Sequence, residues 1–126
     1  MIDYAAGGEV LERYKIAWET FDGDAWVNLF TEDAEYHGDP FDEPLVGHNA
    51  LRAYLLDRAN AQRDVDFTVE RHWVSGSTVL AAWHVAWTAP ADGRLVRWAG
   101  FLTADVASDG RISRFREWAL PAPADG

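Results

Sequence analysis

Apolar side chains recur every three or four residues through the first half of the chain, which is the spacing of one helical face. This pattern predicts an amphipathic helix over residues 9–21. Its apolar face carries Val10, Tyr14, Ala17, Trp18 and Phe21. Residues 22–24 interrupt the helix, and Asp24 is a good N-cap for a short second helix that reaches Phe30. A third helix is expected over about residues 50–63.

Beyond residue 64 apolar and polar side chains alternate, as they do in half-buried strands. The four strands expected there are residues 67–73, 79–88, 94–105 and 111–119. A short strand is expected at residues 35–37, and a frayed tail from about residue 120. Helices followed by hairpin-linked strands predict a single α+β domain over residues 1–126, with three N-terminal helices covering one face of a curved antiparallel sheet. Such a sheet leaves a cavity at its open end.

The composition narrows the range of partners. The chain has 126 residues, 48% of them hydrophobic, and a formal net charge of −10, which suits one folded domain and disfavours nucleic acid or an anionic membrane surface. No apolar run approaches the roughly 18 residues of a membrane span, and no secretory signal is visible, so a cytoplasmic protein is expected. The absence of cysteine excludes disulfides and thiolate metal sites.

Several segments together resemble the nuclear transport factor 2-like superfamily, in particular its SnoaL-like branch. These segments are residues 26–36 (WVNLFTEDAEY), 40–47 (PFDEPLVG), 50–54 (ALRAY), 109–112 (DGRI) and 116–118 (REW). The resemblance implies a cone-shaped α+β barrel of the cystatin-like type, with an apolar pocket, no cofactor and a homodimer formed through the sheet. Members include polyketide cyclases, ketosteroid isomerases, limonene-epoxide hydrolases and scytalone dehydratases, so the resemblance does not choose one reaction.

By resemblance to the ketosteroid isomerases, Asp39 is a candidate for the general base that takes a proton from carbon next to a carbonyl. This alignment needs gaps, and without them Gly38 takes that position. The alternative is that Asp39 starts a turn ahead of Pro40. His37 lies two residues earlier and forms a candidate acid/base pair with Asp39. No third ligand accompanies the pair, so no metal is expected.

Two tyrosines and one glutamate are candidates for the other polar groups of the pocket. Tyr14 occupies, without gaps, the place of the isomerases' oxyanion-stabilising tyrosine, although it also fits the helix face as a core residue. The isomerases' second oxyanion donor falls near Ala99, which cannot donate. Tyr36 and Glu117 resemble the water-holding tyrosine and the aspartate of limonene-epoxide hydrolases. Arg97 is the predicted partner of Glu117, because an unpaired buried carboxylate is costly.

The hydrolases' arginine and aspartate on the central strand correspond to Trp83 and Val85, so the hydrolase mechanism is not expected. The expected ligand-binding wall consists of Trp18, Trp83, Trp87, Arg97, Trp98 and Phe101. The expected dimer contact on the outer sheet face consists of Leu80, Ala82, Ala86 and Phe101.

Two functions remain open. One is cofactor-free acid/base chemistry of isomerase, cyclase or dehydratase type on a small apolar or carbonyl-bearing molecule. The other is a non-catalytic ligand-binding or dimerisation module.

Overall fold

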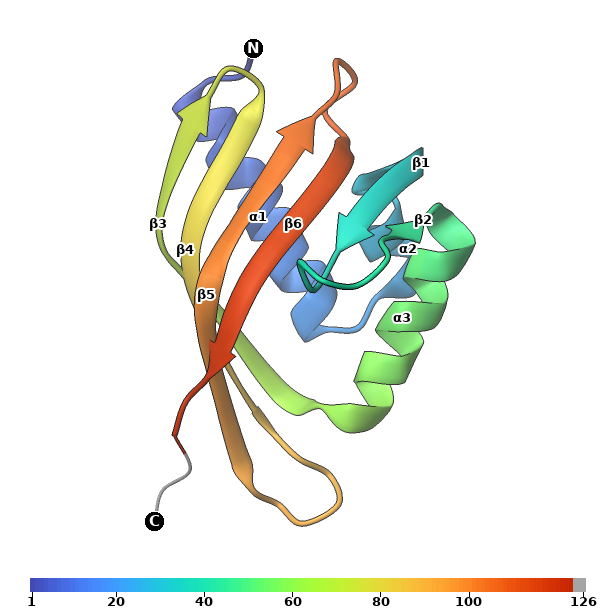
Figure 1. Ribbon diagram of the computed structural model, residues 1–126, viewed down its shortest axis with the longest axis vertical. Coiled ribbons are helices and arrows are strands. Elements are labelled where there is room, and N and C mark those ends of the chain that lie inside the picture. Colours follow the sequence, from blue (N-terminus) through green and yellow to red (C-terminus); the bar gives the residue numbers. More distant parts are fainter. Residues whose placement is uncertain (124–126) are drawn as a thin grey trace.

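Three helices lie on one face of a six-stranded sheet in the computed structural model, which describes residues 1–123 (Figure 1). The elements in chain order are α1 (Tyr4–Glu19), α2 (Gly23–Val27), β1 (Phe30–His37), β2 (Leu45–Val46), α3 (His48–Ala61), β3 (Arg63–Ser75), β4 (Thr78–Thr88), β5 (Leu95–Val106) and β6 (Ile112–Pro121). Figure 1 shows α1 running behind the long strands β3 to β6, with α3 beyond β1 and β2. The predicted α+β architecture is confirmed.

The strands form one sheet in the order β2-β1-β6-β5-β4-β3. The pairs β3–β4, β4–β5 and β5–β6 are antiparallel, as predicted, but β1 pairs parallel to β6, with Tyr36 opposite Phe115. A tight hairpin turn forces two consecutive strands to be antiparallel. β1 and β6 are separated along the chain by β2, α3 and three further strands, so no such turn joins them and they can pair in parallel. The parallel pairing brings Tyr36 next to the strand that carries Glu117.

The second helix begins earlier than the sequence pattern predicts. Asp22, not Asp24, is its N-cap, because the Asp22 side chain accepts a hydrogen bond from the backbone N–H of Ala25 at 3.1 Å. Asp24 instead forms an ion pair with Arg52 of α3 at 2.8 Å. The helix also ends earlier than predicted, at Val27, and Phe30 belongs to β1.

The last strand continues farther than predicted. β6 extends to Pro121, and the backbone N–H of Ala122 donates to the carbonyl oxygen of Arg97 at 2.8 Å. Residues 120–122 are therefore held by the sheet, where the sequence predicts the start of a frayed tail. The end of that predicted tail, residues 124–126, lies outside the described residues.

The inner face of the sheet is densely filled toward one end only. There, the cross-strand row that runs from Val79 on β4 to Phe115 on β6 is buried. Four residues farther along these strands, the corresponding row consists of Trp83, Gly100 and Ala119. Gly100 has no side chain and that of Ala119 is a single methyl group. This part of the inner face therefore leaves space under the helices unfilled.

Gly100 is required by a close approach of neighbouring groups. A Cβ at this position would lie 2.0 Å from the carbonyl oxygen of Trp118 and 2.9 Å from the ring of Trp83. Both distances are far shorter than van der Waals contact, and the first involves backbone, which cannot move by itself. The absence of a side chain lets the Trp83 indole lie across β5 and form part of a wall.

We expect Gly100→Ala to lower the free energy of unfolding by about 3 kcal/mol, because the added methyl group overlaps the Trp118 carbonyl. Gly23→Ala is the control, since its Cβ would meet only the flexible tip of Arg52, at 3.1 Å. It should change the free energy by less than about 1 kcal/mol. Urea unfolding followed by tryptophan fluorescence measures both. Equal stability of the two variants would contradict the close approach at Gly100.

Candidate functional site

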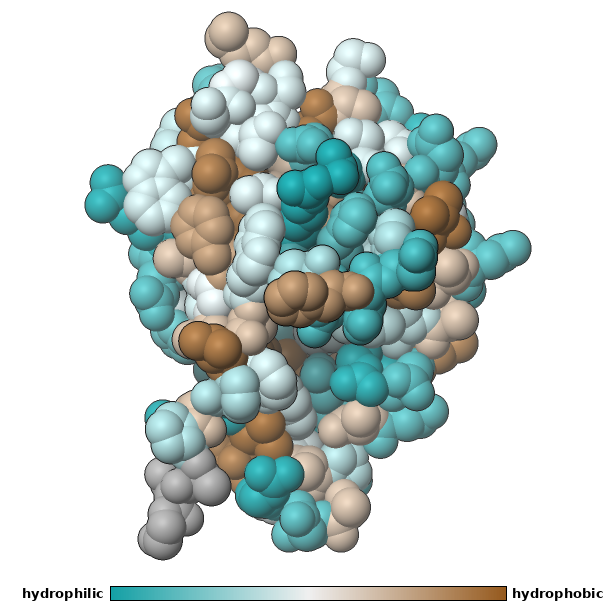
Figure 2. Space-filling view, viewed as in Figure 1, coloured by the Kyte–Doolittle hydropathy of each residue, from teal (hydrophilic) through white to brown (hydrophobic). Residues whose placement is uncertain are grey.

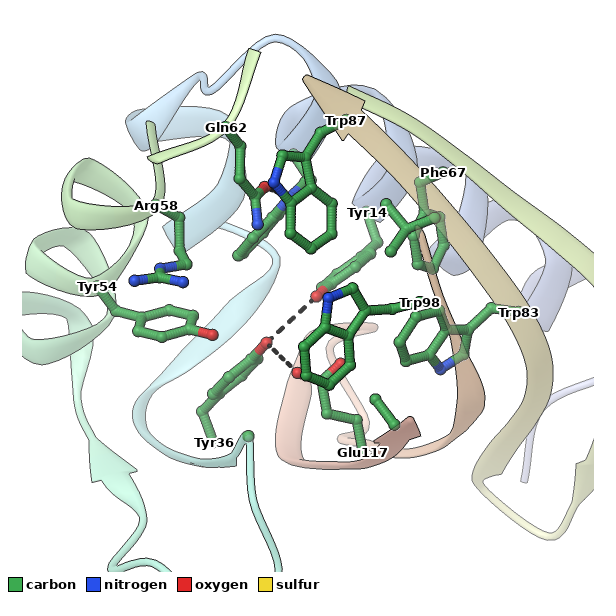
Figure 3. Close-up of a pocket in the computed structure, with 14 residues that line it drawn as sticks. Tyr14, Tyr36, Tyr54, Arg58, Gln62, Phe67, Trp83, Trp87, Trp98 and Glu117 are labelled. Atoms are coloured by element: carbon green, nitrogen blue, oxygen red, sulfur yellow. Dashed lines mark hydrogen bonds between the residues drawn. The ribbon is translucent and has the colours of Figure 1, made fainter. Parts of the chain in front are cut away.

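A cavity of about 220 Å³ lies between the inner face of the sheet and the helices (Figure 3). Its lining residues are Tyr14, Trp18, Tyr36, Gly38, Tyr54, Arg58, Gln62, Phe67, Trp83, Val85, Trp87, Trp98, Glu117 and Ala119. The repeat of each element brings these side chains together: Tyr14 and Trp18 are about one helical turn apart on α1, as are Tyr54 and Arg58 on α3. The lining residues of β4 alternate with outward-facing ones.

Three polar side chains form a hydrogen-bonded chain in this cavity. The Tyr36 hydroxyl donates to Glu117 Oε1 at 3.2 Å, and the hydroxyl oxygens of Tyr14 and Tyr36 are 3.4 Å apart (Figure 3). A phenol has one hydrogen to donate, so Tyr14 is the donor toward Tyr36 whenever Tyr36 donates to Glu117. This arrangement leaves Oε2 of Glu117 available to a ligand.

The surroundings of Glu117 favour its neutral form. Burial raises the pKa of Glu117 to about 7, and the hydrogen bond from Tyr36 opposes this effect only in part. Burial and the charge of Glu117 raise the pKa of Tyr14 and of Tyr36 well above the usual value, and raise the pKa of Tyr54 to about 12. Near neutral pH, Glu117 can therefore accept or give a proton, whereas the phenols remain protonated donors.

The ring of Phe115 positions the two phenols that lead to Glu117. It stacks on Tyr36 with a centroid distance of 4.8 Å and 3° between the ring planes, and on Tyr14 at 5.1 Å and 11°. Trp26 packs edge-on against Tyr36 at 5.6 Å. All of these rings are buried, so turning either phenol away would open a void in the core.

Most of the residues predicted for the site line this cavity. They are Tyr14, Trp18, Tyr36, Trp83, Trp87, Trp98 and Glu117. The structure therefore brings together residues from α1, β1, β4, β5 and β6 that lie far apart in the sequence. Their catalytic and ligand-binding roles stay predictions.

Asp39 does not line the cavity. Its side chain is exposed, and Oδ1 accepts a hydrogen bond from the backbone N–H of Phe41 at 2.8 Å, which is the turn that formed the alternative prediction. His37 follows Tyr36 on β1 and therefore points to the other side of the strand, where its Nε2 lies 3.7 Å from Glu35. The predicted pair of His37 and Asp39 is thus not part of the cavity lining.

Arg97 and Phe101 lie on the outer face of the sheet. Trp98 faces the cavity, and residues at odd spacing from it along β5 point the opposite way. Phe101 contacts Trp73 of β3, with ring centroids 6.0 Å apart. The sheet therefore separates Arg97 from Glu117, and the predicted ion pair between them is replaced by the hydrogen bond from tyrosine.

Seven lining residues were missed by the sequence predictions: Gly38, Tyr54, Arg58, Gln62, Phe67, Val85 and Ala119. Tyr54 and Arg58 lie four residues apart on α3, and this spacing is the signal that identifies a shared helix face. Gln62 is buried directly after α3, and its Oε1 accepts a hydrogen bond from Trp18 Nε1 at 3.2 Å. Phe67 fits the alternation of apolar and polar residues in β3, but no other feature of the sequence marks it as a cavity residue.

The cavity contains few groups that can transfer a proton. Glu117 is the one carboxylic acid among its lining residues, and no histidine lines it. Within residues 1–123, no group of three or more His, Cys, Asp or Glu side chains has the arrangement of a metal site. No helix in the same part of the chain combines the length and the apolar character that crossing a membrane requires.

Comparison with known proteins relates this geometry to a family. A sequence-family model described as the SnoaL-like domain matches residues 10–115. A similar solved structure is the epoxide hydrolase/cyclase-like enzyme SalBIII, described as acting in pyran ring formation in the polyether salinomycin. The two chains are 22% identical, the similarity covers 95% of each, and the TM-score is 0.84. A search of curated proteins found no match.

Two further solved structures have the same fold. One is a protein with a ketosteroid isomerase-like fold from Catenulispora acidiphila, in complex with trimethylamine. It is 14% identical over 87% of this chain and 84% of that one, with a TM-score of 0.75. The other is a computationally designed 17-OHP binder, 16% identical over 93% of this chain and 98% of that one, with a TM-score of 0.77. At these identities the likeness concerns the fold alone.

We expect Glu117→Gln to make the protein more stable than the wild type above pH 7. The pKa of Glu117 is raised in the folded state, so its contribution to stability is complete below about pH 4.5 and is lost as the pH rises through 7. Between pH 5 and pH 8 the wild type should lose about 2 kcal/mol relative to Glu117→Gln, a figure reduced for the partial exposure of the side chain.

Denaturant unfolding at both pH values measures this difference. Asp39→Asn is the control, because its side chain is exposed and the amide oxygen preserves the turn hydrogen bond. A parallel pH dependence in the wild type and Glu117→Gln would contradict a carboxyl group held in an apolar site.

Proposed function

This chain belongs to the family of SnoaL-like domains, and from that premise we propose that its cavity binds a small, mainly apolar, carbonyl-bearing molecule and that Glu117 transfers a proton on it without a cofactor. The observation that carries the proposal is the Tyr14–Tyr36–Glu117 hydrogen-bonded chain, which ends on a carboxyl group whose pKa is near 7 inside an aromatic cavity. A general acid or base works best when its pKa lies near the working pH.

The chemistry follows from the hydrogen bonds. Ionised Glu117 takes a proton from carbon next to the ligand carbonyl, and the oxygen of that carbonyl gains negative charge. Once Glu117 is protonated, it no longer needs the hydrogen bond from Tyr36, whose hydroxyl hydrogen then becomes available to the charged oxygen. Return of the proton to another atom completes an isomerisation, and the same groups serve a cyclisation or a dehydration.

The names of the similar structures support this reaction class. One is described as epoxide hydrolase/cyclase-like and another as having a ketosteroid isomerase-like fold. The first description names hydrolase and cyclase types of enzyme, whereas the second describes a fold and names no reaction. The candidate base differs from the expectation for a ketosteroid isomerase, because Gly38 lines the cavity where Asp39 does not.

The test uses 2-tetralone, a two-ring ketone, as the probe. We expect the wild type to accelerate exchange of the protons next to its carbonyl for deuterium in D₂O, followed by ¹H NMR. Glu117→Gln should reduce the enzyme-dependent rate at least about 100-fold, which is the range for loss of a general base. The wild-type rate should rise with pH through a midpoint near 7, as the pKa of Glu117 requires. Asp39→Asn should retain the wild-type rate, and equal rates for wild type and Glu117→Gln would refute Glu117 as the base.

A second candidate function is ligand binding without a reaction. The cavity lining contains one carboxylic acid, whereas acid/base enzymes commonly use two titratable groups. This difference favours binding without a reaction. Ala99, near which the second isomerase donor was expected, is exposed and alternates with the cavity-lining Trp98. Binding of 2-tetralone with no exchange above background would select this function.

The outer face of the sheet is the proposed contact of a homodimer. Phe101, Trp73 and Trp118 expose aromatic surface there, together with Leu120, and Figure 2 shows apolar residues gathered over the long strands. An exposed apolar patch of this kind commonly marks an interaction site.

We expect sedimentation velocity to give twice the 14.1 kDa mass of one chain. Phe101→Asp should shift the protein to the mass of one chain, because it places a charge in the contact. Leu56→Asp is the control, since Leu56 is an exposed leucine of α3 and lies away from the sheet. A wild type that sediments as one chain at high concentration would contradict the dimer.

A further inference from the structure

Two neighbouring side chains of the cavity lining, Arg58 and Gln62, have hydrogen-bond donors that the fold does not use; the buried Nε1 of Trp83, elsewhere in the lining, is also without a partner. Arg58 Nε is buried and has no hydrogen-bond partner, while Nη2 of the same side chain bonds to Asp57 at 2.8 Å. Gln62 uses its Oε1 to accept from Trp18, and its amide nitrogen has no partner among the described residues. Figure 3 shows Gln62 and Arg58 on the same side of the cavity, with the Arg58 guanidinium over the Tyr54 ring.

No lining residue accepts a hydrogen bond from Arg58 Nε. Glu117 is the one carboxylate of the cavity, and Tyr36 already donates to one of its oxygens. A buried unpaired donor such as Arg58 Nε is costly, so a ligand gains affinity by placing acceptor atoms on the side of Arg58 and Gln62. The Arg58 guanidinium is permanently positive, so it favours a ligand whose acceptor atoms carry negative charge.

Two tyrosine rings, Tyr54 and Tyr36, lie between Arg58 and Glu117. The Arg58 Cζ lies 5.9 Å from the centre of the Tyr54 ring, and the rings of Tyr54 and Tyr36 are 5.4 Å apart. Tyr36 in turn donates to Glu117. The Arg58 guanidinium and the Glu117 carboxyl group are therefore separated by the Tyr54 and Tyr36 rings.

We infer that the ligand is a small apolar monocarboxylate whose carboxylate binds Arg58 and Gln62 while its other end lies against Glu117. The inference rests on the proposed function, because it names the substrate class of the same cavity. The planar guanidinium matches a carboxylate, and a single arginine neutralises a single negative charge. An apolar cavity of about 150 Å³ holds benzene, so about 220 Å³ suits a ligand of one or two rings.

The existing ion pair leaves Arg58 able to bind such a ligand. Asp57 is 69% exposed in its side chain and occupies Nη2 only. Exposed ion pairs of this kind contribute little to stability and exchange readily with other anions. The Nε of Arg58 is one of two buried donors of the cavity lining, with Trp83 Nε1, that the described residues leave without a partner, and it is the charged one.

The test compares 2-naphthoate with 2-acetonaphthone, a neutral ketone of nearly the same shape, by isothermal titration calorimetry at pH 6 and low salt. At this pH Glu117 is mainly protonated and does not repel the carboxylate. We expect the wild type to bind 2-naphthoate about tenfold more tightly than 2-acetonaphthone, as a charge-assisted hydrogen bond predicts. Arg58→Met keeps the side-chain stem over Tyr54 and should abolish this preference, because it weakens binding of 2-naphthoate about tenfold more than binding of the ketone.

Arg52→Met is the matched control, because Arg52 lies on the same helix, pairs with Asp24 and does not line the cavity. It should keep the preference for 2-naphthoate. If the wild type binds the ketone but does not prefer 2-naphthoate, or if Arg58→Met weakens both probes equally, the carboxylate inference is wrong and the proposed function stands. If the wild type binds neither probe and does not exchange 2-tetralone protons, both are wrong.

Discussion

A carboxyl group enclosed by aromatic rings is the constraint around which this molecule is arranged. Glu117 loses solvation in the cavity, so its charge has to be removed by a proton or met by a hydrogen bond. Tyr36 supplies that hydrogen bond, and Tyr14 supplies the next one. Phe115 stacks on both phenols and belongs to the same strand as Glu117. The acid and the ring that positions its donors are thus carried by β6, and the parallel pairing of β1 with β6 brings Tyr36 between them.

The sheet provides both a packed core and a hollow, because the sizes of the inner side chains change along its strands. At the filled end, Phe115 and Val79 pack under α1 and leave no room for a ligand. At the other end, Gly100 and Ala119 leave space that the large ring of Trp83 borders but does not fill. A cavity bounded by rigid indoles keeps its shape without a ligand, which lowers the entropic cost of binding.

The charges of the cavity differ from those of the whole chain. The net charge of −10 makes the surface unattractive to anions in general, yet Arg58 places a positive charge at the cavity. Because that charge lies beside Tyr54 and away from Glu117, an anionic group and a reacting group can occupy the cavity together. Selection of a ligand then depends on the distance between its two functional groups as well as on its apolar surface.

The sequence by itself determined the order and type of the elements, because a helix repeat and a strand alternation are local properties of the chain. The inward direction of Tyr14 and of Trp83 followed from the same repeats. Only the tertiary structure decided which acid faces the cavity. Asp39 had the stronger sequence signal, but a turn hydrogen bond holds it outside. Arg97 had the right charge, but the register of β5 turns it outward, and Arg58 enters the cavity instead because of the way α3 packs. Strand register and helix packing are set by contacts between residues far apart in the chain, which no local pattern records.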